Sequence, residues 1–250
     1  MNKLCTIVGA GPGLGAALGR RFEKAGYRIA LIGRQLRQLE NVANEISVQE
    51  GQVGVFVADA GNESELVTAL GRTRTWGGDT DILIYNAAAM TEGLASTVST
   101  AGLIADMAVN IGGAITAVRT VLPAMRARRR GTILFTGGGL ALEPYPEWTS
   151  LAAGKAALRA YAVALHKEVA LDNVHVAVVA ICGLIEPGGL FDPDLLAEHY
   201  WRLHAAPATP RPRELVYLPT GADPFYNDQQ AKYRATSRPI HATDMYEVAP

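Results

Sequence analysis

The sequence has few cysteines, almost no net charge and no long uninterrupted apolar run. Its 250 residues include two cysteines, Cys5 inside an expected strand and Cys182 at the end of another. We expect two buried free thiols, and their spacing does not suit a metal site. The net charge of -1 argues against a nucleic-acid-binding protein, because such proteins are normally basic.

The basic residues gather in only one place, the segment 126–130 with sequence Arg-Ala-Arg-Arg-Arg. This segment lies at an expected helix end, where cations complement the helix dipole. We interpret it as a solvated helix end in preference to a phosphate or nucleic-acid patch. No signal peptide precedes the first expected strand, and no apolar run reaches membrane-spanning length. We therefore expect a cytoplasmic protein with no nucleic-acid or membrane partner.

Apolar segments of strand length alternate with segments of helical periodicity, and 49% of the residues are hydrophobic. The expected strands are Leu4–Gly9, Arg28–Gly33, Val53–Ala58, Ile82–Tyr85, Thr132–Thr136 and Val174–Ile181. The first three expected helices are Leu14–Ala25, Leu36–Ile46 and one that contains Leu66 and Leu70. Two more follow Tyr85, the second from about Leu103 to Arg128, and the next is Leu151–Leu171.

Strands this apolar are typical of a parallel sheet that is buried on both faces. Strict alternation with helices predicts an α/β fold, a single Rossmann-type doubly wound parallel sheet flanked by helices. We assign residues 1–205 to this Rossmann-type domain. Several prolines interrupt the pattern beyond it, so residues 206–250 are expected to hold a last strand at Glu214–Leu218 and an extended tail.

A glycine-rich turn joins the first strand to the first helix. Its sequence is Gly9-Ala10-Gly11-Pro12-Gly13-Leu14-Gly15. Glycines permit a tight turn there, and they let a pyrophosphate approach the bare amides of a helix N-terminus. A purely structural turn is the alternative, but the strand–turn–helix context favours a cofactor site formed by Gly9, Gly11, Gly13, Leu14 and Gly15.

The spacing of these glycines resembles that of the short-chain dehydrogenase/reductase family, and further matches follow in order over about residues 4 to 190. Asp59 matches the family's adenine-contacting Asp, and Asn86-Ala87 resembles part of its Asn-Asn-Ala-Gly motif. Asn110 matches the Asn that positions a proton-relay water, and Lys155 matches the active-site Lys that also contacts the nicotinamide ribose. Asp59 can equally cap a helix, and Asn86 can be a strand-end turn residue.

Arg34 follows the second strand, where an NAD-specific protein would carry a carboxylate for the ribose hydroxyls. A guanidinium suits a 2′-phosphate instead. Arg34 therefore favours NADP(H) as cofactor, with NAD(H) less favoured, although a solvated arginine at a helix start is the alternative.

Two family hydroxyls are missing. Leu151 stands four residues before Lys155, where the family has its proton-donating Tyr, and Gly138 stands where it has a Ser. Leucine can neither donate nor accept a proton. Tyr145 is the nearest phenol that could replace the Tyr, while Glu143, Glu147 and the amides of the Gly137–Gly139 run are alternatives. Each of these loop residues can also be merely structural.

After the sixth strand the resemblance places Gly183 over the nicotinamide and a mobile substrate lid at about residues 186–204. The segment Asp192–His204 is typical of an amphipathic helix. Its Tyr200 and Trp201 suit either an apolar substrate pocket or plain packing. His199 and His204 are expected at the surface.

The resemblance thus implies an NADP(H)-dependent oxidoreductase of a small-molecule substrate, with a non-standard active site that keeps Lys155 and Asn110. A catalytically silent NADP(H)-binding protein, acting as sensor or assembly partner, is the alternative. Homo-oligomers, dimers or tetramers, are expected through the helices Leu103–Arg128 and Leu151–Leu171. Close approach is assigned to Ala152, Ala153, Ala156, Ala157 and Ala160, and apolar surface to Leu158, Tyr161 and Leu165.

Overall fold

The computed structural model describes residues 3–46, 52–207 and 211–222. Its centre is one parallel sheet of seven strands in the order β3-β2-β1-β4-β5-β6-β7. The strands are β1 Leu4–Val8, β2 Arg28–Gly33, β3 Val53–Val57, β4 Ile82–Tyr85, β5 Gly131–Thr136, β6 Val174–Ile181 and β7 Glu214–Tyr217. The predicted fold class is confirmed, as is a last strand beginning at Glu214. The expected tail beyond residue 222 lies outside the described residues.

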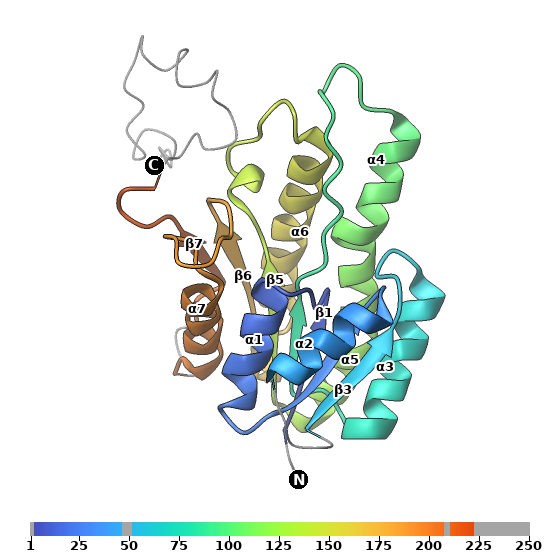
Figure 1. Cartoon of the computed structure of the whole chain (residues 1–250). Helices are drawn as coiled ribbons and strands as arrows, with labels where there is room; N and C mark the ends of the chain where they lie inside the picture. The colour runs from blue at the N-terminus through green and yellow to red at the C-terminus, as the bar shows by residue number, and fades with distance from the viewer. Residues whose placement is uncertain (1–2, 47–51, 208–210, 223–250) are drawn as a thin grey trace.

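Helices cover both faces of the sheet (Figure 1). The helices are α1 Leu14–Glu23, α2 Leu36–Ile46, α3 Glu63–Gly77, α4 Thr100–Met107, α5 Gly113–Arg128, α6 Thr149–Glu168 and α7 Pro193–Ala205. Helices α1, α2 and α7 close one hydrophobic core with the sheet, and α3, α5 and α6 close the other. Every residue of β1, β4, β5 and β6 is buried, as an apolar parallel strand between two helical layers requires.

The chain between β4 and α5 differs from the expectation of two separate helices. Residues 86–99 form an irregular segment, which bridges to α6 through Gly93 and Trp148. One continuous helical stretch then follows, in which the π-helical turn η1 (Ala108–Gly112) joins α4 to α5. By length and composition, Thr100–Arg128 is apolar enough to cross a membrane, with 39% of its most apolar window buried. Its α5 part packs in a hydrophobic core of the described structure, through residues such as Ala117, Val121 and Met125.

The strand order and register bring several loops to one level at one edge of the sheet. Val8 of β1 pairs with Ile32 of β2 on one side and with Tyr85 of β4 on the other. The residues that follow these strands therefore emerge side by side at their carboxyl ends. Strand order reverses between β1 and β4, which is the point where open α/β sheets bind ligands.

Candidate functional site

The glycine-rich turn is shaped by two close approaches and one open surface. Gly9 has φ +87°, and a Cβ on it would overlap the backbone of Ala87. A Cβ on Gly15 would lie 2.9 Å from the Cα of Ala10, so this glycine lets α1 begin close to β1. At Gly11 and Gly13, by contrast, a Cβ would have no atom of the described residues within 4 Å. The open side of the turn is thus where a ligand can reach the backbone.

Helix α1 begins at Leu14 directly beneath this open side. Its N-cap is Gly13, and within the described structure no side chain caps its first turn. The side chain of Leu14 is buried in the core, so only its backbone can serve a ligand. First-turn amides without an intrahelical partner are a natural site for a phosphate group.

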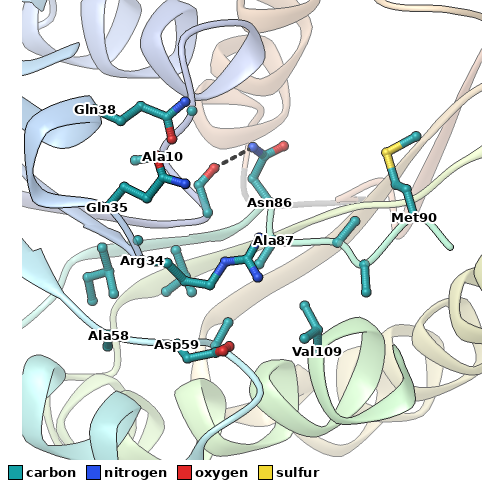
Figure 2. Close-up of a pocket in the computed structure, with 18 residues that line it drawn as sticks. Ala10, Arg34, Gln35, Gln38, Ala58, Asp59, Asn86, Ala87, Met90 and Val109 are labelled. Atoms are coloured by element: carbon teal, nitrogen blue, oxygen red, sulfur yellow. Dashed lines mark hydrogen bonds between the residues drawn. The ribbon is translucent and has the colours of Figure 1, made fainter. Parts of the chain in front are cut away.

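A cavity of about 340 Å³ continues from this turn across the ends of β2, β3 and β4. Gly9, Gly11, Arg34, Asp59, Asn86 and Ala87, all expected at a cofactor site, line it. Figure 2 shows the Arg34 side chain extending across the cavity between Ala87 and Asp59. Gln35, Gln38 and Met90 also line it, although the sequence analysis did not single them out. The one feature of the sequence that could have indicated these three residues is that each follows an expected strand within a few positions.

Asn86 ties three strand ends together. Its Nδ2 donates to the carbonyl of Gly9 at 2.8 Å, and its Oδ1 accepts from the hydroxyl of Thr136 at 2.9 Å. Thr136 in turn accepts a hydrogen bond of 2.8 Å from the buried phenol of Tyr200. Asn86 is therefore a clamp across β1, β4 and β5 as well as a cavity residue, and Thr136 is its partner that the sequence analysis missed.

Asp59 lies in the cavity wall and does not cap α3. Its Oδ1 accepts from the amide of Gly61 at 2.8 Å, while the N-cap of α3 is Asn62, whose side chain accepts from the amide of Glu65. The capping alternative for Asp59 is therefore wrong, because the helix begins three residues later than that alternative required.

Lys155 lies at the carboxyl end of β5, on the same edge of the sheet as the cavity. The helix that carries it, α6, contacts Asn110 of η1. A Cβ on Gly154 would overlap the Asn110 side chain, so this glycine lets α6 contact η1 closely. The Asn110 carboxamide is buried and bonds both the amide and the carbonyl of Ala89, at 2.8 and 3.1 Å. Lys155 Nζ donates to the Thr136 carbonyl at 2.7 Å. Burial lowers the pKa of Lys155 to about 8.

The residues around Lys155 offer few protic side chains. Leu151, one turn earlier, packs in a small apolar cluster with Leu140, Tyr145 and Ala152. Tyr145 is thus buried beside Leu151. A Cβ on Gly138 would lie 3.7 Å from Lys155 Cγ, an ordinary contact distance, so a side chain of serine size fits there.

A buried carboxylate stands one turn before Asn110. Asp106 accepts from Ser150 Oγ at 2.6 Å and from Thr91 Oγ1 at 2.9 Å, which links α4, α6 and the segment after β4. No motif in the sequence pointed to this group of side chains. The one indication was a single acidic residue, Asp106, in an otherwise apolar stretch of helix.

Gly183 and α7 are both closely packed in this structure. A Cβ on Gly183 would overlap the Phe191 ring, so the connection between β6 and α7 folds back on itself. Helix α7 packs beside α1, where Arg21 pairs with Glu198 at 2.6 Å. Tyr200 is fully buried, and Trp201 packs edge-on against Phe22 at 5.6 Å between ring centroids. Tyr200 and Trp201 therefore both pack against neighbouring elements in this structure.

The two histidines of α7 are not simple surface residues. His199 stacks against Tyr217 with ring centroids 4.8 Å apart. His204 bonds the hydroxyls of Tyr27 and Thr132, both at 2.9 Å, at the opposite edge of the sheet from the cavity. His204 is half-buried, and it reaches these two hydroxyls because α7 ends near the starts of the strands.

The comparisons with known proteins agree with this architecture. The family model described as short chain dehydrogenase matches residues 3–189. The chain is similar to a 2,3-dihydro-2,3-dihydroxybenzoate dehydrogenase of Bacillus subtilis, with 28% identity over 187 residues, 75% of this chain and 69% of that protein. A metagenomic short-chain oxidoreductase solved in complex with NADP matches with a TM-score of 0.79 and 26% identity, over 87% of this chain and 97% of that one. A 3-ketoacyl-(acyl-carrier-protein) reductase from Brucella melitensis, complexed with NADH, matches in fold with a TM-score of 0.77 at 23% identity, over 86% and 96% of the two chains.

Proposed function

Because the chain belongs to the short chain dehydrogenase family, we propose that it is an NADP(H)-dependent oxidoreductase with a non-standard active site. The observation that carries this proposal is the preserved cradle at the switch point of the sheet. Gly9 and Gly15 permit the close approaches there, while Gly11 and Gly13 leave the helix start open to a ligand. Open amides at a helix start directly after a strand are suited to a pyrophosphate group.

In this proposal the amides of Gly13, Leu14 and Gly15 hold the pyrophosphate, and Asp59, Asn86 and Ala87 surround the adenine end. Arg34 reaches over the cavity and holds the 2′-phosphate, with Gln35 and Gln38 beside it. The NADP complex of the metagenomic relative supports the same cofactor.

The bound nicotinamide would supply or accept a hydride, and the chain's own residues would then handle the proton. Leu151 and Gly138 stand where the family carries its Tyr and Ser, so neither can serve. We propose that Lys155 is the proton donor, since its Nζ lies at the carboxyl end of β5, where it donates to the Thr136 carbonyl, and its lowered pKa, about 8, suits acid–base exchange near neutral pH. Asn110 holds η1 against the segment after β4 and so positions α6.

Tyr145 remains the second candidate for the acid, because its ring lies in the same apolar cluster as Leu151. Gly183 would lie beside the nicotinamide, and residues 186–192 are the part of the expected lid that precedes α7. The substrate is a small molecule with a carbonyl, an alcohol or an activated double bond. Loss of the two hydroxyls should make generic ketones and secondary alcohols poor substrates.

A silent NADP(H)-binding protein is the second candidate. The burial of Leu151 against Leu140 and Tyr145 favours it, because this apolar contact fills the place where a donor hydroxyl is expected. Lys155 would then serve only the cofactor ribose.

One set of variants separates the two candidates. NADPH affinity and NADPH oxidation are measured over a panel of ketones, aldehydes and conjugated enones, for the natural chain and for Lys155→Met, Lys155→Arg and Tyr145→Phe. We expect tight NADPH binding in all but the Lys155 variants, and turnover that disappears with Lys155→Met. A loss of turnover in Tyr145→Phe alone would transfer the acid role to Tyr145.

The double variant Leu151→Tyr with Gly138→Ser is the matched control, since the space at Gly138 accepts a serine. NADPH binding without turnover in the natural chain and in this double variant would establish the silent alternative. Absence of NADPH binding in the folded natural chain would contradict the whole proposal.

A further inference from the structure

A second cavity lies at the opposite edge of the sheet from the cofactor cradle. Its volume is about 120 Å³, and its walls come from residues that directly precede or begin strands, together with the end of α7. This volume is well below that of drug-sized pockets, which span roughly 300–1,000 Å³. It suits an ion or a single small group.

The charge of the wall is predominantly positive. Lys3, Arg130 and Arg211 all line it, while Asp81 is the one carboxylate among the described lining residues. Asp81 is already committed to the fold: one oxygen accepts from the amide of Leu4 at 3.0 Å, and the other accepts from Arg130 at 3.2 Å. Because Asp81 is paired with Arg130, the net positive charge of the described wall comes from Lys3 and Arg211.

A hydrogen-bonded chain of three side chains forms part of the same wall. The ring of His204 bonds the Tyr27 hydroxyl through Nε2 and the Thr132 hydroxyl through Nδ1, both at 2.9 Å. Burial, followed by the charge of Lys3, lowers the pKa of His204 to about 4, so the ring is neutral at physiological pH.

A neutral imidazole has one N–H donor and one acceptor nitrogen. It therefore receives a hydrogen from one of the two hydroxyls and donates to the other, whichever tautomer is present. The hydroxyl that accepts keeps its own hydrogen for a third group. Both hydroxyl-bearing residues line the cavity, so in either tautomer one O–H donor is left to face it.

From this convergence of cations and a spare hydroxyl donor, we propose that the cavity binds a small oxyanion of phosphate size. Lys3 and Arg211 supply the net positive charge, Arg130 adds a guanidinium that is paired with Asp81, and Tyr27 or Thr132 supplies a neutral hydrogen bond. Free inorganic phosphate and a phosphoryl group on a small metabolite share this chemistry. The site is independent of the cofactor cradle, since it lies at the other ends of the strands.

Such an anion would connect the segment before β1 to the segment before β7. Lys3 directly precedes β1, and Arg211 comes shortly before β7. In the sheet, β4, β5 and β6 separate these two strands. A ligand that binds only the folded chain raises its stability in proportion to the logarithm of ligand concentration.

The test uses isothermal titration of the full chain with sodium phosphate, with sodium chloride at equal ionic strength as reference. The variant Lys3→Gln with Arg211→Gln removes two of the three cations at exposed or half-buried positions. We expect its phosphate affinity to fall about tenfold or more, as the loss of charge-assisted hydrogen bonds implies. Glycerol phosphate in place of phosphate distinguishes a free ion from a phosphoryl group carried on a small molecule.

The control variant, Lys167→Gln with Arg72→Gln, makes the same charge change at exposed positions on α6 and α3, away from both cavities. Phosphate affinity should remain unchanged in it. If phosphate affinity survives in the Lys3/Arg211 variant, phosphate does not bind in this cavity and the proposal is wrong. Tungstate soaked into crystals gives a second readout, since its anomalous signal must appear between Lys3 and Arg211.

Discussion

The side-chain amide of Asn86 donates a hydrogen bond of 2.8 Å to the carbonyl of Gly9, and so joins the end of β4 to the end of β1. The two strands meet at the point where the strand order of the sheet reverses. Because Gly9 also packs without a Cβ against the backbone of Ala87, the turn and the β4 end form one rigid unit. The cofactor cradle rests on this contact.

The contact predicts an unusual sensitivity of Gly9 to substitution. Gly9 and Gly26 both have φ +87°, but a Cβ on Gly26 would have no atom of the described residues within 4 Å. Gly26→Ala should cost about 1–2 kcal/mol of strain alone. Gly9→Ala should cost about 1–3 kcal/mol more, because it also forces Ala87 away. Urea unfolding of the two variants checks this, and equal losses would show that the Ala87 contact contributes nothing.

Arg34 should decide between the two nicotinamide cofactors. Its guanidinium spans the cavity beside Asp59 (Figure 2), and a charge-assisted contact to a 2′-phosphate is worth roughly 1.5–3 kcal/mol. We expect NADP(H) to bind about tenfold or more tightly than NAD(H), and Arg34→Ala to remove this preference while leaving NAD(H) affinity unchanged. Fluorescence titration measures both affinities. Arg72→Ala, on the exposed side of α3, is the control and should keep the preference.

Lys155 should make the stability of the protein depend on pH in the alkaline range. Burial lowers its pKa from 10.5 to about 8 in the folded chain. Between these values the unfolded chain binds more protons than the folded chain, so the free energy of unfolding rises with pH. The gain is at most about 1.4 kcal/mol for each pH unit.

The measurement compares the natural chain with Lys155→Met by denaturant unfolding at pH 7, 8, 9 and 10. The natural chain should gain stability relative to the variant as the pH rises through this window. A constant difference between the two would mean that Lys155 titrates at its ordinary pKa.

Helix α6 should mediate self-association, although through fewer residues than its sequence suggests. Leu158 and Leu165 are buried inside the subunit, as is Ala152, so these three cannot form an interface. Ala156, Ala160 and Ala164 remain exposed at four-residue spacing. They line, with Val163, a shallow groove along the helix. Small side chains in such a row permit a second helix to approach closely.

We expect light scattering of the natural chain to give a dimer or tetramer mass, and Ala160→Arg to shift it toward the monomer. Val67→Arg on α3 places the same charge on another exposed helical position and should leave the mass unchanged. A monomer mass for the natural chain at micromolar concentration would contradict this prediction.

The fold and the cofactor end of the site could be predicted from the sequence because they depend on local patterns. Apolar strands alternating with helices determine a doubly wound parallel sheet, and the glycines from Gly9 to Gly15 follow the first strand directly. Strand ends in a parallel sheet share one edge, so Arg34, Asp59 and Asn86 had to meet near that turn. No knowledge of side-chain directions was needed for these conclusions.

The surroundings of Lys155 and α7 depend on which way side chains point after distant segments pack together. The periodicity of Asp192–His204 predicted a helix, but only its packing on α1 buried Tyr200 and turned Trp201 toward Phe22. Asp106, Ser150 and Thr91 come from three separate segments, so no local pattern could join them. The cavity around Lys3, Arg130 and Arg211 likewise exists only because parallel strands that lie far apart in the sequence begin at the same edge. Sequence periodicity decides which elements form, whereas the neighbours of each side chain are decided by the burial of whole faces during folding.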